Sequence, residues 1–105
     1  MIEINRVITK KILEGGKITI PKDIIVRFNI KPNDKLKCET KGHTFIKPVI
    51  ANNRITIPIE IREILKLKKG DRTDITIISK IEDFDVNLAG LMRSEKKGRK
   101  KNKQL

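Results

Sequence analysis

The side chains of this sequence that can do chemistry are mostly cationic. The 105 residues include 25 Lys and Arg against 13 Asp and Glu, which gives a formal net charge of +12. A positive field of this strength on a short chain attracts polyanions, so nucleic acid is the first candidate partner. A surface that only keeps the protein in solution is the alternative that charge leaves open.

Catalytic and metal-binding chemistry have little support in the sequence. There is one cysteine, Cys38, and one histidine, His43; no nucleophile with a base, no metal-ligand spacing and no phosphate-binding loop is present. We therefore expect neither an enzyme nor a cofactor. A single cysteine, short apolar runs and residues 1–10 without the apolar middle of a signal peptide predict a cytoplasmic protein with no membrane partner.

Two parts of the chain repeat without a gap, because residues 17–34 match residues 54–71 at a shift of 37 positions. Lys17–Pro21 falls on Arg54–Pro58, and four of these five pairs are identical. A turn pair precedes each run, Gly15-Gly16 in copy one and Asn52-Asn53 in copy two, and both pairs tolerate a positive φ. Each pair therefore predicts a tight hairpin between two strands.

A short helix is expected after each proline, because proline fits the first position of a helix. In copy two, Ile61, Ile64 and Leu65 have the spacing of an amphipathic helix that packs on a sheet. Turn signals at 32–34 and 69–71 end these helices, and strands resume at about 35–40 and 72–79. The expected strands before the turns cover about 7–13 and 44–50.

The expected fold is mostly β with short helices, built from two tandem copies. Copy one covers residues 1–43 and copy two residues 44–81, with the strand 44–50 shared between them, and residues 82–105 form a C-terminal extension. One copy alone would leave strand edges unpaired, so the copies are expected to pack on each other or on a second chain. The interior should be aliphatic, with Cys38 buried at the position that matches Ile75.

The run Arg54–Arg62, followed by Leu65–Asp71, resembles the hallmark of the AbrB/MazE/SpoVT family of swapped-hairpin DNA-binding domains. The resemblance covers roughly residues 5–80 and implies a swapped-hairpin β-barrel. Here the barrel would be either an intramolecular pseudo-dimer or a dimer with strands swapped between chains. The implied partner is double-stranded DNA, with a homodimer as a further possibility.

The resemblance also implies which residues contact DNA: Lys10, Lys17, Lys47, Arg54 and Arg62. Planar guanidinium groups can grip phosphate or a guanine edge with two hydrogen bonds, whereas lysines suit phosphate. Copy one has Ile25 where copy two has Arg62. Arg27 is the nearby candidate in copy one, although helix geometry places positions 25 and 27 on opposite flanks. An asymmetric binder, with copy two dominant, is expected.

The resemblance leaves three functions open. A transcriptional regulator is the leading interpretation; the alternatives are an antitoxin that neutralises a toxin through its C-terminal segment, and a nucleoid-associated architectural protein with little sequence preference. The segment from Arg93 to Leu105 has seven basic residues and one acid, and its composition predicts a disordered basic arm. Such a basic tail does not favour the antitoxin.

Overall fold

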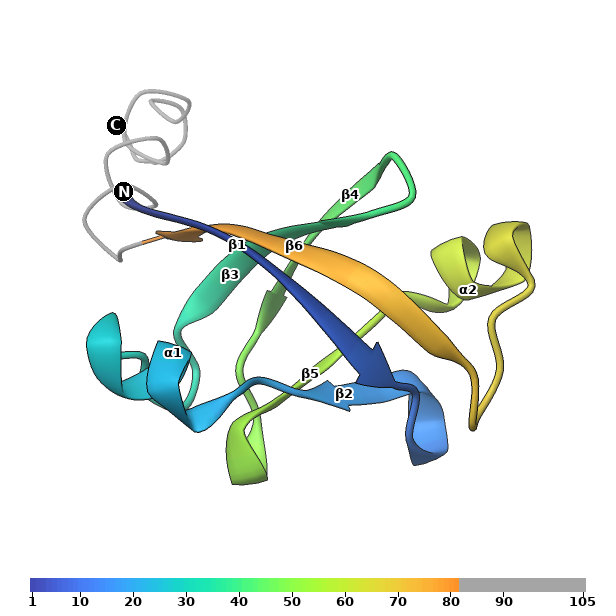
Figure 1. Ribbon diagram of the computed structural model, residues 1–105, viewed down its shortest axis with the longest axis horizontal. Coiled ribbons are helices and arrows are strands. Elements are labelled where there is room, and N and C mark those ends of the chain that lie inside the picture. Colours follow the sequence, from blue (N-terminus) through green and yellow to red (C-terminus); the bar gives the residue numbers. More distant parts are fainter. Residues whose placement is uncertain (82–105) are drawn as a thin grey trace, which may run out of the picture.

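The computed structural model describes residues 1–81 as a mostly β protein with short helices (Figure 1). The segments 82–105, including the expected basic arm, lie outside the described residues. The elements follow in the order β1 (Ile2–Lys11), η1 (Glu14–Gly16), β2 (Lys17–Thr19), α1 (Lys22–Arg27), β3 (Lys35–Thr40), β4 (His43–Pro48), η2 (Ala51–Asn53), β5 (Arg54–Thr56), α2 (Ile59–Leu65) and β6 (Arg72–Ile81).

The strands form two antiparallel sheets. A four-stranded sheet has the order β1-β6-β3-β4, and β2 and β5 form a separate two-stranded ribbon. The 37-residue shift converts β1 into β4 and β3 into β6, so the sheet has the same order from either end. The registers agree as well: Ile8 lies opposite Ile75, and their equivalents Phe45 and Cys38 lie opposite each other. The two copies are therefore related by an approximate internal twofold axis.

Each sheet mixes strands of both copies. Strand β1 of copy one pairs with β6 of copy two, and β3 of copy one pairs with β4 of copy two as well as with β6. In the ribbon, Ile18 of β2 lies opposite Ile55 of β5, its own equivalent. The two sheets are not joined by strand pairing, so the strands do not close the barrel that was expected.

Tight turns lie at both predicted positions, but the strands on either side do not form the expected hairpins, because β2 and β5 pair with each other. Gly15 and Gly16 have φ values of 76° and 80°, and Asn52 and Asn53 have values of 64° and 57°. The amide of Leu13 donates to the carbonyl of Lys17 at 2.7 Å, which closes the first turn. After each turn the chain leaves the strand that precedes it and enters the ribbon, where it pairs with the other copy.

The prolines precede the helices by one residue, so the prediction that they are the first helical residues was wrong. Pro21 has φ −57° and ψ 142°, and Pro58 has φ −55° and ψ 143°. The φ suits a helix, but the extended ψ makes each proline the cap residue. Its carbonyl accepts the first helical hydrogen bonds, for example from Ile24 and Ile25.

The core is aliphatic, as expected. Ile61 is buried and Leu65 packs against the core, but the prediction for Ile64 was wrong because this side chain is 62% exposed. The helix α2 is only seven residues long and contacts the core through Ile61 and Leu65. The buried hydrophobic residues are Ile4, Ile12, Ile18, Ile20, Ile24, Ile30, Leu36, Cys38, Phe45, Val49, Ile55, Ile57, Ile61, Ile75 and Ile77.

Both helices end in a left-handed residue followed by a similar loop. Asn29 has a φ of 52° after α1, and the equivalent Lys66 has a φ of 57° after α2. In the loops, the carboxylate of Asp34 accepts a hydrogen bond from the backbone amide of Lys31, and the carboxylate of Asp71 accepts one from the backbone amide of Lys68. Within residues 1–81, no helix has the length and apolar character needed to cross a membrane.

Candidate nucleic-acid interface

The ribbon β2–β5 has one buried face and one partly exposed face. Ile18 and Ile55 are fully buried, and the residues on either side of them in each strand are half-buried. Successive side chains of a strand point to opposite faces. The outer face of the ribbon therefore presents four side chains: Lys17, Thr19, Arg54 and Thr56.

The four outer residues alternate between cation and hydroxyl. Lys17 lies opposite Thr56 and Thr19 lies opposite Arg54, so the two cations occupy diagonal corners of the face. None of the four is acidic. Such a face can donate hydrogen bonds and attract anions, and nothing on it can hold a metal ion. More widely, residues 1–81 contain no group of three or more His, Cys, Asp or Glu side chains that could hold a metal.

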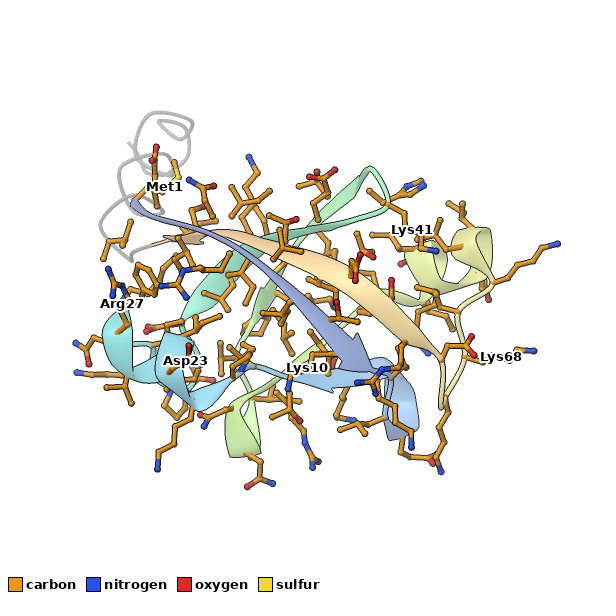
Figure 2. All side chains as sticks on the ribbon, in the orientation of Figure 1. Met1, Lys10, Asp23, Arg27, Lys41 and Lys68 are labelled. Carbon is orange, nitrogen blue, oxygen red and sulfur yellow. The ribbon has the colours of Figure 1, made fainter. Side chains whose placement is uncertain are left out.

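Lys10 and Lys47 extend this surface from the edge strands β1 and β4. Lys10 lies opposite the buried Thr73, and Lys47 lies opposite the buried Leu36. Cross-strand partners share a face of the sheet, so both lysines point to the side of the ribbon. Lys10 and Thr19 line one hollow of about 210 Å³, and Figure 2 shows Lys10 where β1 passes β2.

Arg72 is a basic residue of this region that the sequence analysis missed. It lies opposite Lys11 and lines the same hollow as Lys10 and Thr19. Arg72 lies outside the matched hallmark run, and only the pairing of β1 with β6 brings it here. We name the surface formed by the ribbon and its neighbours the ribbon surface; its members are Lys10, Lys17, Thr19, Lys47, Arg54, Thr56 and Arg72.

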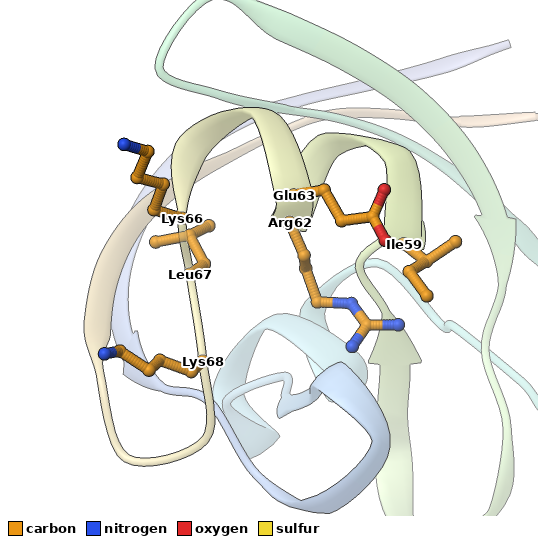
Figure 3. A pocket seen from close by; sticks show the side chains of 6 residues that line it. All are labelled: Ile59, Arg62, Glu63, Lys66, Leu67 and Lys68. Carbon is orange, nitrogen blue, oxygen red and sulfur yellow. The ribbon is translucent and has the colours of Figure 1, made fainter.

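Arg62 lies at one end of the ribbon, and its Nε is engaged by the protein itself. This nitrogen donates to the carbonyl of Ile57 at 2.9 Å. The side chain crosses directly over Gly16, where a Cβ would lie 2.4 Å from Nε. Figure 3 shows Arg62 reaching from α2 toward the first turn. Arg62 thus joins the helix of copy two to the turn of copy one.

The equivalent place in copy one is built differently. Asn53, with a side chain, replaces Gly16, and the partly buried Ile25 replaces Arg62. The long side chain of Arg62, in copy two, therefore crosses a turn of copy one that has a glycine. The sequence analysis expected the difference between Arg62 and Ile25 to affect DNA contact. In the structure, it goes together with the difference between Gly16 and Asn53 in the turns.

Arg27 lies apart from the ribbon surface. It is exposed in the last turn of α1, with its Cζ 5.9 Å from the centroid of the Phe28 ring, and Figure 2 shows it near one end of the molecule. Arg6 lies at the same distance from this ring and 4.0 Å from the carboxylate of Asp23. The structure thus brings together Lys10, Lys17, Lys47 and Arg54, places Arg62 beside them, and separates Arg27.

Two polar groups at or near the ribbon surface have notable surroundings, Nε of Arg54 and the carboxylate of Glu14. Nε of Arg54 is buried and has no hydrogen-bond partner within the described part of the chain. Near the other end of the ribbon, Lys69 donates to Glu14 at 2.8 Å, and this hydrogen bond and the lysine charge lower the pKa of Glu14. The acid closest in sequence to Lys17 is therefore paired with another lysine.

Comparison with known proteins shows the fold but not the family. No protein-family model and no curated protein matches this sequence. The solution structure of PHS018 from Pyrococcus horikoshii is similar with a TM-score of 0.63 and 18% sequence identity, and the match covers 79% of this chain and 100% of that one. At this identity the similarity establishes a shared fold.

Proposed function

We propose that this protein binds duplex DNA through the ribbon surface and regulates transcription, as the resemblance to the AbrB/MazE/SpoVT family implies. The observation that carries the proposal is the gathering of Lys10, Lys17, Lys47 and Arg54 around one outer face of a two-stranded ribbon. These residues come from four strands, β1, β2, β4 and β5, and share no packing role that would require four cations together.

The shape of the ribbon supports this proposal. A two-stranded antiparallel ribbon fits the major groove of B-DNA, where side chains from its outer face reach the base edges. Lysines at the margins suit phosphate contacts, while Arg54 on the face itself suits a guanine edge.

The strand exchange between copies supports the finer assignment of the fold. We interpret the molecule as an intramolecular pseudo-dimer of swapped hairpins, because β1, β2 and β3 of copy one all pair with strands of copy two. One chain would then supply both halves of the DNA-binding unit. Its approximate twofold axis would match that of a pseudo-palindromic duplex.

Fluorescence anisotropy of labelled duplex DNA, titrated at several salt concentrations, tests the proposal. Each phosphate contact contributes about 0.9 to the slope of log affinity against log salt. Lys17→Gln and Lys47→Gln should each lower that slope. Lys41→Gln should not, because Lys41 is exposed in the turn between β3 and β4, which lies far from Lys10 in Figure 2. If the wild-type protein does not bind DNA at low salt, the proposal is wrong.

A second candidate is an architectural protein that coats DNA with little sequence preference. The observation that favours it is the state of Arg62, whose Nε is committed to the carbonyl of Ile57. Arg54 is then the principal arginine for base recognition, and the other central contacts are lysines. Competition between a selected duplex and random duplex distinguishes the two: a regulator prefers the selected site, and a coating protein does not.

A further inference from the structure

A hollow lies beside α2, between the helix and the loop that follows it (Figure 3). Its volume is about 350 Å³, near the lower end of the range for sites that bind small molecules. Three of its lining residues are cations and one is an acid, so the hollow has an excess of positive charge. The lining residues are Ile59, Arg62, Glu63, Lys66, Leu67 and Lys68.

The apolar part of this lining comes from two aliphatic side chains. Leu67 is partly buried and packs against the core, whereas Ile59 is 54% exposed at the start of α2. A ligand that covers both side chains removes apolar surface from water, which favours binding. The lining therefore combines an apolar surface with cations, and this combination suits a ligand that has an apolar body and an anionic group.

The cations of the hollow are not neutralised by nearby acids. Within residues 1–81, no carboxylate forms an ion pair with Arg62, Lys66 or Lys68. Figure 3 shows the carboxylate of Glu63 turned away from both lysines. The guanidinium of Arg62 is held in place by the hydrogen bond from its Nε to the carbonyl of Ile57, and its terminal nitrogens provide further donors. An anionic group in the hollow would therefore meet three positive charges.

The equivalent positions of copy one do not repeat this lining. Ile25 lies where copy two has Arg62, and Asn29 lies where copy two has Lys66. The equivalent of the apolar Ile59 is a lysine. Because the same backbone forms in copy one without these side chains, the fold does not require them in copy two.

The conformation of Lys66 also indicates a binding role. Its φ of 57° lies in the left-handed region, where a lysine is strained and the equivalent Asn29 is better tolerated. Residues in strained conformations cluster at sites that bind ligands. A lysine at this position supplies a charge to the hollow at a conformational cost that the asparagine of copy one avoids.

We propose that the hollow binds a small organic anion. Its carboxylate, sulfonate or phosphate group lies among Arg62, Lys66 and Lys68, and its apolar body contacts Ile59 and Leu67. The planar guanidinium offers two parallel hydrogen bonds to the anionic group, while the two lysines contribute charge.

The affinity of this site is modest, because one side of the hollow is open to solvent. For a ligand of about twenty non-hydrogen atoms we expect a dissociation constant on the order of 10–100 µM. The carboxylate of Glu63 at the margin disfavours a second anionic group, so ligands with a single charge bind best. Binding does not require DNA, so the proposal stands or falls separately from the proposed function.

Fluorescence titration of the full chain without DNA, with anilinonaphthalenesulfonate as the probe, tests the proposal. This probe joins an aromatic body to a sulfonate and fluoresces when it enters an apolar site. We expect one site per chain. N-phenylnaphthylamine, which has the same body without the sulfonate, should bind at least tenfold more weakly. Sulfate, an anion without an apolar body, should displace the probe only at concentrations at least tenfold above those of the probe, at constant ionic strength.

Substitutions locate the site. Lys66→Gln and Lys68→Gln should each raise the dissociation constant of the probe about twofold to fivefold, as expected for an exposed charge pair. Ile59→Gln should raise it about threefold or more, because apolar contact is lost. Lys31→Gln, at the equivalent of Lys68, and Val26→Gln, at a 67% exposed position of α1, are the matched controls and should leave it unchanged. Circular dichroism checks that all variants are folded.

Heteronuclear NMR tests the part assigned to Arg62. Its Nε–H group donates to the carbonyl of Ile57, and the amide of Ile57 donates to the carbonyl of Gly16 at 3.0 Å. The probe should therefore shift the signals of the Arg62 Nε–H group and of the Ile57 amide. Signals that stay in place while the probe binds overturn the assignment of Arg62.

Four results overturn the proposal as a whole. The probe does not bind, or it binds at several places that the substitutions in copy two leave unchanged. Sulfate competes as well as the probe itself, which makes the hollow a phosphate contact for nucleic acid. Binding weakens as the protein concentration rises, which means that a second copy of the chain covers the hollow.

Discussion

Gly16 and Arg62 are the pair of residues that most clearly links the two copies. The absence of a side chain at position 16 gives the arginine room to cross the turn and reach the carbonyl of Ile57. A backbone with positive φ at this position adds a second reason for glycine. Arg62 therefore has a structural role, because it joins the helix of copy two to the turn of copy one.

Gly16→Ala should destabilise the protein by about 2–3 kcal/mol, because the new Cβ meets both a positive φ and the arginine side chain. Gly15→Ala is the matched control, since its φ is also positive but its Cβ meets only the flexible end of Lys17, at 2.8 Å. Urea denaturation measures both. Equal effects of the two substitutions would contradict a specific contact between Gly16 and Arg62.

Cys38 is buried in the core, and this burial raises the pKa of its thiol to about 12, above an ordinary value of 9.0. The folded thiol therefore stays protonated while the unfolded thiol ionises, so this group should reduce stability as pH rises from about 9 toward 12. At neutral pH, labelling by a thiol reagent should proceed only through unfolding and accelerate with urea. Rapid labelling of the native protein would contradict the enclosed position.

At the scale of elements, the two helices are similar in backbone and different in sequence. Each begins after a proline cap and is followed, within two residues of its end, by a residue in the left-handed conformation. Copy one has Asn29 at that end, a residue that tolerates the conformation, whereas copy two has Lys66. A lysine in this conformation is strained by roughly 1 kcal/mol.

Lys66→Gly should therefore stabilise the protein by about 0.5–1 kcal/mol, because glycine adopts the left-handed conformation without strain. Glu63→Gly, inside α2, is the control and should destabilise by about 0.5–1 kcal/mol, since glycine is a poor helix former. Thermal denaturation measures both changes. A destabilised Lys66→Gly variant would contradict the described end of α2.

At the scale of the whole molecule, the copies are not independent domains. Both sheets contain strands of copy one and copy two, and the centre of the ribbon is the pair Ile18 and Ile55. If the strands of one copy unfold, the strands of the other copy lose their pairing partners. The molecule should consequently unfold as one cooperative unit.

Ile18→Ala should lower the free energy of unfolding by about 2–4 kcal/mol, because the side chain is fully buried. Native-state hydrogen exchange should show the same loss of protection at the amides of β3 in copy one and of β6 in copy two. Val7→Ala, at a 67% exposed position, is the control and should change little. Loss of protection confined to copy one, or two separate unfolding transitions, would contradict the shared sheets.

The sequence by itself determined the local structure and the internal symmetry. The turn pairs at 15–16 and 52–53, the helices after Pro21 and Pro58 and the order of strands follow from short-range backbone preferences, and the 37-residue repeat showed that they occur twice. The basic residues of the ribbon surface, apart from Arg72, were identified through the resemblance to a family. Their proximity, however, depends on strand pairing.

Only the tertiary structure decided which strand pairs with which, and therefore which side chains meet. The patterns at β2 and β5 permit pairing within a copy as well as between copies, because side-chain alternation is the same in both. The partner of Arg62, the exposure of Ile64 and the position of Arg72 each depend on residues distant in the sequence. Local preferences contain no information about such contacts, which arise when the two copies pack together.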